Sequence, residues 1–310
     1  MDDCNVPANT HKNETAGPGG REKAGAALVS IISNSALVLL KLLAGLLTGS
    51  VAILSEAIHS GMDLVAAVMA YVSVRVADKP ADSHHPYGHG KAEHLAALFE
   101  GALIVGAGAA IIWQAAKGFF SPEPLPGLGL GALVMLISAV VNILVSRFLF
   151  RVGRRTESAA LVADAWHLRT DVYTSLGVFA ALGGIMLGQR VNPDLNLAFL
   201  DPLCAVIVAL MILKAGIKLT WEAIGQLLDH SLSPEELKLV KSHIRQYAPE
   251  IVGYGAIKTR RSGSCRVVFM ELIVDGAMNV EEAHALGERV ADSIREHFPD
   301  SQITFHLEPK

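Results

Sequence analysis

Two short stretches of the sequence each place a histidine four residues before an aspartate. His59 and Asp63 lie in "SEAIHSGMD", and His167 and Asp171 lie in "DAWHLRTDVYTS". On a helix, residues four apart share a face, so each stretch presents an imidazole and a carboxylate one turn apart. Two imidazole nitrogens and two carboxylate oxygens can form a closed tetrahedral shell around Zn²⁺.

The sequence around both pairs is apolar, so the explanation for these polar residues has to take account of their position among apolar residues. A single histidine there can be explained as a polar residue that bonds a neighbouring helix. Ionisable groups inside a membrane are costly, however, and they usually face a pathway or a partner. With neutral imidazoles the four residues carry two negative charges, which a divalent cation cancels. The sequence therefore predicts a metal site at membrane depth.

The composition supports a membrane protein. The chain has 310 residues, of which 51% are hydrophobic and 18% are charged, whereas soluble domains carry about 25% charged residues. The net charge of −4 offers no basic surface, so we expect no nucleic-acid partner. The cysteines are far apart and form no CxxC motif, so we expect free thiols at Cys4, Cys204 and Cys265.

Six apolar stretches are long enough to span a bilayer, which takes about 20 residues. We expect spans at 25–48, 51–76, 94–118, 127–150, 160–187 and 198–221. The connections at 75–93 and 147–157 carry the lysines and arginines, and the remaining connections carry few. The positive-inside rule then puts both termini in the cytosol. Residues 1–22 lack the apolar core of a signal peptide and are expected to form a disordered cytosolic tail.

The chain changes character after about residue 228. "SPEELKLVKSHIRQYA" opens with a capping box at Ser233, and "NVEEAHALGERVADSIREHF" is an amphipathic helix with Asn279 as its N-cap. Strands are expected on either side of the turn at 261–264 and again at 301–309. The division is thus 1–22 as a tail, 23–227 as a transmembrane domain and 228–310 as a small cytosolic α-β-β-α-β domain.

Three motifs together carry a family resemblance. "SEAIHSGMD", "PADSHHPYGHGKAEHLAAL" and "DAWHLRTDVYTS" occur in this order across six spans that precede a cytosolic α/β domain. This arrangement resembles the cation diffusion facilitator family over about residues 23–310. The resemblance implies an all-α six-helix transmembrane domain joined to a cytosolic α+β, ferredoxin-like domain.

The resemblance also implies a function. Family members are typically homodimeric exporters that exchange cytosolic divalent metal, most often Zn²⁺, for protons. We therefore expect a multi-pass protein of the bacterial inner membrane that has no enzymatic activity and no organic cofactor. His59, Asp63, His167 and Asp171 fall on the family's transport site, and this set resembles the zinc-preferring branch.

Further positions match metal-binding residues of relatives. In the loop, Asp82, His85 and His89 match a second cluster, and His84 is an additional candidate. The alternative for this loop is a structural turn, because Gly88 and Gly90 flank His89 and the stretch opens the third span. Lys91 matches a residue that pairs with an acid after the sixth helix, here Asp229.

In the cytosolic domain, His284, His306 and Glu308 match positions that bind metal in relatives. Gly255 and Glu271 stand where histidines are expected, so solvated surface groups are the alternative. Two hypotheses compete with Zn²⁺ export. One is a family exporter of Fe²⁺, Cd²⁺ or Co²⁺, and the other is a membrane metal sensor without transport. A membrane metallohydrolase would instead need an open metal position and a general base.

Overall fold

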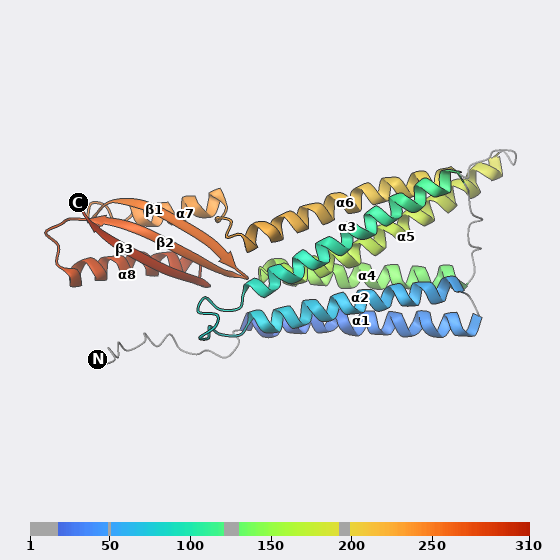
Figure 1. The fold of residues 1–310 in the computed structure, drawn as a ribbon, viewed down its shortest axis with the longest axis horizontal. Coiled ribbons are helices and arrows are strands. Elements are labelled where there is room, and N and C mark those ends of the chain that lie inside the picture. The colour runs from blue at the N-terminus through green and yellow to red at the C-terminus, as the bar shows by residue number, and fades with distance from the viewer. Residues whose placement is uncertain (1–17, 49–50, 121–129, 192–198) are drawn as a thin grey trace.

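The computed structural model describes residues 18–48, 51–120, 130–191 and 199–310. The chain forms a bundle of six long helices with a small α/β domain at one end (Figure 1). We call the end of the bundle beside this domain the proximal end, and the opposite end the distal end. All four residues of the expected metal site lie in the helical bundle.

The six helices of the bundle are 26 to 33 residues long. They are α1 Pro18–Thr48, α2 Val51–Ala77, α3 Lys91–Phe120, α4 Leu130–Arg155, α5 Ala159–Val191 and α6 Leu200–Leu227. Within the described residues, five of them are long and apolar enough to cross a membrane. The remaining helix, α5, carries the His167 motif and packs among the other five.

Several helices extend beyond the expected apolar spans at the proximal end. Helix α1 begins at Pro18, so the expectation of an unstructured tail up to residue 22 was wrong for residues 18–22. Proline is favourable at the first helical position, where its missing N–H would have no partner anyway. Helix α4 similarly continues to Arg155, because a helix that leaves the apolar layer can carry charged side chains into water. Residues 1–17 lie outside the described part of the chain.

Small residues allow the helices to approach closely. An added Cβ at Gly101 of α3 would lie 2.5 Å from Thr220 Oγ1 of α6, and one at Gly108 would lie 2.8 Å from Leu213. Such close packing is typical of membrane helices, which gain little from hydrophobic burial against one another. In Figure 1, α3 and α6 run beside each other and lean away from α1 and α2 toward the distal end.

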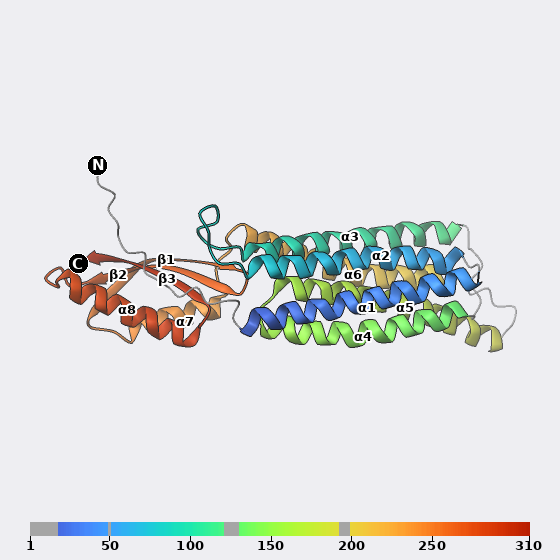
Figure 2. The same cartoon turned by 90° about the horizontal axis from the view of Figure 1, so that it is seen from below.

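The C-terminal domain has the element order expected from the sequence. Its elements are α7 Pro234–Arg245, β1 Ile251–Ser262, β2 Cys265–Val274, α8 Val280–His297 and β3 Ser301–Pro309. Strands β1 and β2 form an antiparallel hairpin, and α8 crosses over so that β3 pairs parallel to β2. Helices α7 and α8 lie on one face of the sheet (Figure 2) and cover a core that includes Met270, Leu272 and Leu286.

The tip of the β1–β2 hairpin packs against the proximal end of the bundle. The backbone N–H of Gly263 donates a hydrogen bond to Nε2 of His94 over 3.2 Å. Gly263 has a φ of 61°, a conformation that glycine adopts at little cost. Gly90, just before α3, lies so close to the Ser262 carbonyl that a Cβ there would overlap it. The two domains therefore meet backbone to backbone.

Charged residues surround this contact. Glu157 and Asp229 follow α4 and α6, and both have positive φ angles of 51° and 59°. Glu157 accepts hydrogen bonds from Arg261 over 2.8 Å and from Arg266 over 2.7 Å. Asp229 pairs with Lys91 at 2.9 Å and with Arg260 at 3.1 Å. The hydrogen bond from Lys91 keeps the pKa of Asp229 below its ordinary value.

The Gly90 contact yields a first prediction. Gly90→Ala should lower the stability of the purified protein by about 1–3 kcal/mol, because the added methyl group overpacks the junction. Gly25→Ala in α1 is the matched control, since nothing lies within 4 Å of a Cβ there, and alanine favours a helix by up to about 1 kcal/mol. Thermal unfolding in detergent measures both variants. Equal unfolding temperatures would show that the hairpin does not require this close approach.

Candidate metal centre

Helices α2 and α5 run in opposite directions, and this crossing assembles the two His-Asp pairs. His167 Nε2 lies 3.0 Å from Asp63 Oδ1, and His59 Nε2 lies 4.0 Å from Asp171 Oδ1. Because the helices are antiparallel, moving four residues forward along α2 corresponds to moving four residues back along α5. Each imidazole therefore faces a carboxylate of the other helix.

The ligand atoms converge on a small volume. Ligand atoms of His59, Asp63 and Asp171 all lie within 4.8 Å of one another, and His167 adjoins them through its contact with Asp63. The structure thus brings together all four residues singled out by the i, i+4 spacing. Two carboxylates and two neutral imidazoles suit a divalent cation of the zinc class in charge and in ligand number.

Exposure differs between the two ends of this centre. On the proximal side, the side chains of His167 and Asp63 are 13% and 7% exposed. On the distal side, those of His59 and Asp171 are 57% and 22% exposed. The helices therefore enclose the His167–Asp63 pair more fully than the His59–Asp171 pair.

Two further carboxylates are buried on the proximal side of the centre. Glu100 of α3 and Asp164 of α5 are both fully buried, and no hydrogen-bond partner reaches their oxygens within the described part of the chain. His167 Nδ1 is likewise unpartnered there, so Asp164 does not orient the imidazole although it lies one turn before His167. A carboxylate buried in an apolar span is costly unless a proton, a cation or a hydrogen-bond donor compensates it.

Sequence reasoning missed Glu100 and Lys41. Glu100 interrupts the apolar run "LAALFEGALIV", and an isolated acid in a span is a signal that could have found it. Lys41 of α1 is buried and donates a hydrogen bond to Ser60 over 2.7 Å. Ser60 adjoins His59, so a lysine of a third helix lies next to the centre.

The loop between α2 and α3 holds a second cluster. His85 Nδ1 lies 3.2 Å from Asp82 Oδ1, and His89 Nε2 lies 3.3 Å from Asp82 Oδ2. Among the described residues, the ligand atoms within 4.8 Å of one another here belong to Asp82, His85 and His89, without His84. We call these three residues the loop triad.

Backbone hydrogen bonds organise the loop triad. The N–H of His85 donates to Asp82 Oδ1 over 2.7 Å, and this bond is the main reason that the pKa of Asp82 lies below its ordinary value. Asp82 therefore stays ionised near neutral pH. Gly88, with a φ of 80°, turns the chain before His89. The turn and a metal site are thus compatible, because the turn itself gathers the ligand atoms.

Comparisons with known proteins agree with the two-part architecture of the chain. Residues 27–228 match a family model described as "Cation efflux transmembrane domain". Residues 232–310 match a second model, described as "Cation efflux protein, cytoplasmic domain". The chain belongs to the cation diffusion facilitator family. Its bundle and its α/β domain correspond to the two domains of that family, as expected from the motifs.

Two relatives match over most of their length. An uncharacterised transporter of Synechocystis is 37% identical over 91% of this chain and 89% of its own. A cation-efflux pump, FieF, of Klebsiella pneumoniae is 32% identical over 94% of each chain. One solved structure from work on the zinc transporter CzrB is 31% identical but covers 26% of this chain and 98% of its own, with a TM-score of 0.25.

The C-terminal candidates of this family member are only partly gathered. Glu271 and His306 pair across β2 and β3, and His306 Nε2 lies 3.0 Å from Glu308 Oε1. Glu271 accepts a hydrogen bond from the Ala256 backbone over 2.8 Å, and a side chain at Gly255 would collide with it. His284 is exposed on α8 and packs beside Phe305, with ring centroids 5.6 Å apart. One carboxylate oxygen of Glu271 is thus engaged with the backbone of β1.

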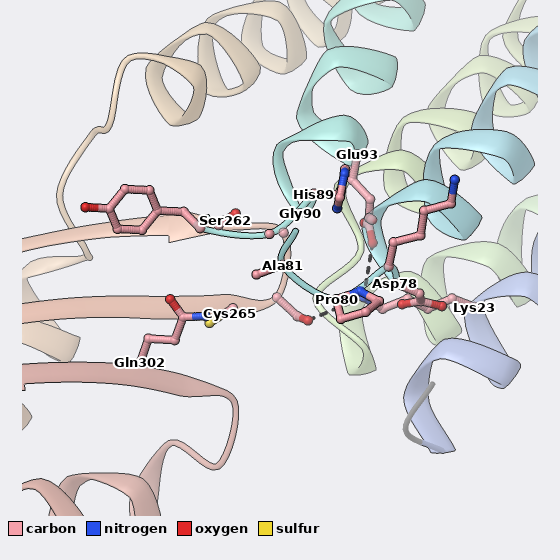
Figure 3. A pocket seen from close by; sticks show the side chains of 16 residues that line it. Lys23, Asp78, Pro80, Ala81, His89, Gly90, Glu93, Ser262, Cys265 and Gln302 are labelled. Carbon is pink, nitrogen blue, oxygen red and sulfur yellow. Dashed lines mark hydrogen bonds and ion pairs between the residues drawn. The ribbon is translucent and has the colours of Figure 1, made fainter. Parts of the chain in front are cut away.

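A cavity of about 200 Å³ lies between the hairpin tip and the loop (Figure 3). Lys23 and Glu93 both line this cavity, and Lys23 Nζ donates a hydrogen bond to Glu93 Oε1 over 3.1 Å. Burial raises the pKa of Asp78 and of the Cys265 thiol in its lining. His89 belongs to both features, since Nε2 faces Asp82 while its buried Nδ1 has no partner in the described residues. The loop triad and the domain junction therefore share a side chain.

The loop triad yields a second prediction. Asp82→Asn should weaken metal binding in the loop by at least about 100-fold, because losing even an indirect partner of a ligand costs about 10–100-fold. Metal retained by the full chain after desalting, measured by mass spectrometry, checks this. His84→Ala is the control, because His84 reaches Asp82 through its backbone N–H. Equal metal content in Asp82→Asn and the parent protein would contradict metal binding by the triad.

Proposed function

We propose that this protein exports Zn²⁺ by exchanging it for protons at the centre formed by His59, Asp63, His167 and Asp171. The observation that carries the proposal is the antiparallel crossing of α2 and α5, which makes a four-ligand centre of net charge −2 inside the bundle. A divalent cation neutralises this charge. Because the chain belongs to a family of cation efflux proteins, we infer that the bound ion is transported across the membrane and is not held permanently.

Ligand chemistry supports the coupling to protons. Metal binds neutral imidazole and ionised carboxylate, so binding releases the protons that these groups hold in the metal-free state. Protons arriving from an acidic side would in turn displace the metal. Glu100 and Asp164 are buried on the proximal side of the centre and offer additional positions for protons.

The difference in exposure supports alternating access. His59 and Asp171 are the more exposed pair, and His167 and Asp63 are the more enclosed pair. This arrangement fits a state that is open to the distal side and closed to the proximal side. A transporter requires a second state in which the two sides are reversed.

The distribution of basic residues supports an orientation of the protein in the membrane. The proximal end carries most of the basic residues that flank the spans, namely Arg75, Lys79, Lys91, Arg147, Arg151, Arg154 and Arg155. The positive-inside rule assigns this end and both termini to the cytosol. We therefore assign the protein to the bacterial inner membrane as a homodimer, with its C-terminal domain in the cytosol. The bacterial relatives and the matched cytoplasmic-domain description support this assignment.

The alternative functions differ in what they need. Export of Fe²⁺, Cd²⁺ or Co²⁺ would use the same centre, with no organic cofactor in either case. A metal sensor would need the loop triad and the C-terminal residues His284, His306, Glu308 and Glu271, but not a centre within the bundle. An enzyme would need an open position for water. Flux into sealed vesicles separates transport from sensing.

A third prediction tests the centre. Asp171→Asn keeps the shape of the side chain but leaves a bound divalent ion short of one negative charge, and an uncompensated buried charge costs about 3–5 kcal/mol. Zinc flux in proteoliposomes under a pH gradient should therefore fall about 100-fold or more. Glu250→Gln, an exposed carboxylate paired with Arg289, is the control and should transport normally. Near-normal flux in Asp171→Asn would refute the four-ligand centre.

A fourth prediction concerns the choice of metal. Imidazole suits zinc, whereas carboxylate oxygens suit harder ions such as Mn²⁺. His59→Asp should therefore increase flux of Fe²⁺, Mn²⁺ or Cd²⁺ relative to Zn²⁺ and change the pH dependence, because the added carboxylate must be protonated when metal is absent. Competitive flux at several pH values measures the ratio. An unchanged ratio would mean that His59 does not bind the transported ion.

A further inference from the structure

One face of α4 carries an apolar stripe that ends in three arginines. Spaced alternately by four and three residues, the stripe consists of Leu133, Ile137, Val140, Leu144, Arg147, Arg151 and Arg154, and every one of these side chains is exposed. This spacing keeps all seven on one side of the helix. The helix lies at the edge of the bundle in Figure 2. The stripe therefore faces outward, apolar along the bundle and cationic at the proximal end.

The dimensions of the stripe match one leaflet of a bilayer. From Leu133 to Leu144 the helix rises about 17 Å, at ~1.5 Å per residue. One leaflet contributes about half of the ~30 Å hydrocarbon core. An acyl chain of ordinary length can therefore lie along the apolar part while its headgroup reaches the arginines.

The three arginines lack acidic partners in the described part of the chain. Like charges at these spacings repel each other along a helix. Within the described residues, Arg155 pairs with Glu22, while no ion pair joins Arg147, Arg151 or Arg154 to a carboxylate. A bound anion would relieve the repulsion.

A fourth arginine approaches from the neighbouring helix. Arg169 lies about ten residues into α5, and its guanidinium lies 5.6 Å from the centre of the Phe150 ring. Arg154 lies over the same ring at 5.3 Å, and Trp166 packs edge-on against it. Two guanidinium groups from two helices thus gather around one aromatic ring.

The Arg169 guanidinium is incompletely satisfied. Its Nε is buried and has no hydrogen-bond partner among the residues that the structure describes. An arginine within a span is costly without a partner. A phosphate group can accept paired, charge-assisted hydrogen bonds from a guanidinium, which makes it a fitting partner.

We propose that the α4–α5 face binds an anionic phospholipid of the leaflet beside the C-terminal domain. Arg151, Arg154 and Arg169 hold the phosphate, and the acyl chain lies along the apolar stripe of α4. Basic surfaces at the ends of membrane helices are suited to such headgroups. A second copy of this chain is a poor occupant, because pairing the stripe with itself would bring arginines against arginines.

Native mass spectrometry of the full-length protein tests the proposal. Protein in detergent is titrated with phosphatidylglycerol or with phosphatidylcholine of the same chains. We expect phosphatidylglycerol to bind more tightly, and Arg154→Gln and Arg169→Gln each to weaken it about fivefold, the contribution typical of one basic residue near an anionic headgroup. Arg169→Lys should retain more binding than Arg169→Gln, because it keeps the charge.

Controls distinguish binding at this face from a general loss of positive charge and from misfolding. Arg75→Gln removes an exposed basic residue in the last turn of α2, which belongs to neither α4 nor α5, and should leave binding unchanged. Unfolding temperatures in phosphatidylcholine verify that the variants fold. Equal binding of the two lipids, or unchanged phosphatidylglycerol binding in the Arg154→Gln/Arg169→Gln double variant, would overturn the proposal. So would full displacement of the lipid by inorganic phosphate, which lacks the acyl chain.

Discussion

Charge placed inside an apolar bundle must be balanced within a few ångströms, and this constraint organises the whole molecule. Deep in the bundle, Asp63 meets His167. At the proximal end, Lys23 of α1 meets Glu93 of α3, which also accepts a hydrogen bond from Ser158. Each pair joins helices that are distant in sequence, so the need for neutral pairs also fixes how the helices are arranged. At the candidate metal centre, a bound divalent cation would balance the two carboxylates in the same way.

At the junction between the two domains, which is more exposed to solvent, acidic side chains are likewise paired with basic ones. The acids after α4 and α6 are held by arginines of β1 and β2, and the hairpin tip rests on glycine and on His94. Helix α3 begins at this contact, carries Glu100 on the proximal side of the metal centre and continues to Phe120. A displacement of the C-terminal domain would therefore act first on α3 and on the loop triad.

Much of this could be predicted from the sequence, because it depends on local spacing. The i, i+4 pairs, the six apolar stretches and the element order of the C-terminal domain all follow from periodicity and capping residues. The pairing of His59 with Asp171 could not be predicted in that way, because it depends on the register of two helices about a hundred residues apart. The contacts of Glu157 with Arg261 and Arg266 were missed for the same reason. The start of α1 was misjudged because glycine and proline near Pro18 are typical of unstructured segments.

The antiparallel register of α2 and α5 has a consequence for errors in assembly. If α5 slid by one turn in one direction, His167 would come opposite His59 and two imidazoles would meet. A slip in the other direction would set Asp171 against Asp63, so that two carboxylates would meet. The order His-then-Asp on both helices thus makes every neighbouring register electrostatically inferior to the native one. The four residues therefore favour the native helix register, in addition to the metal-binding role proposed for them.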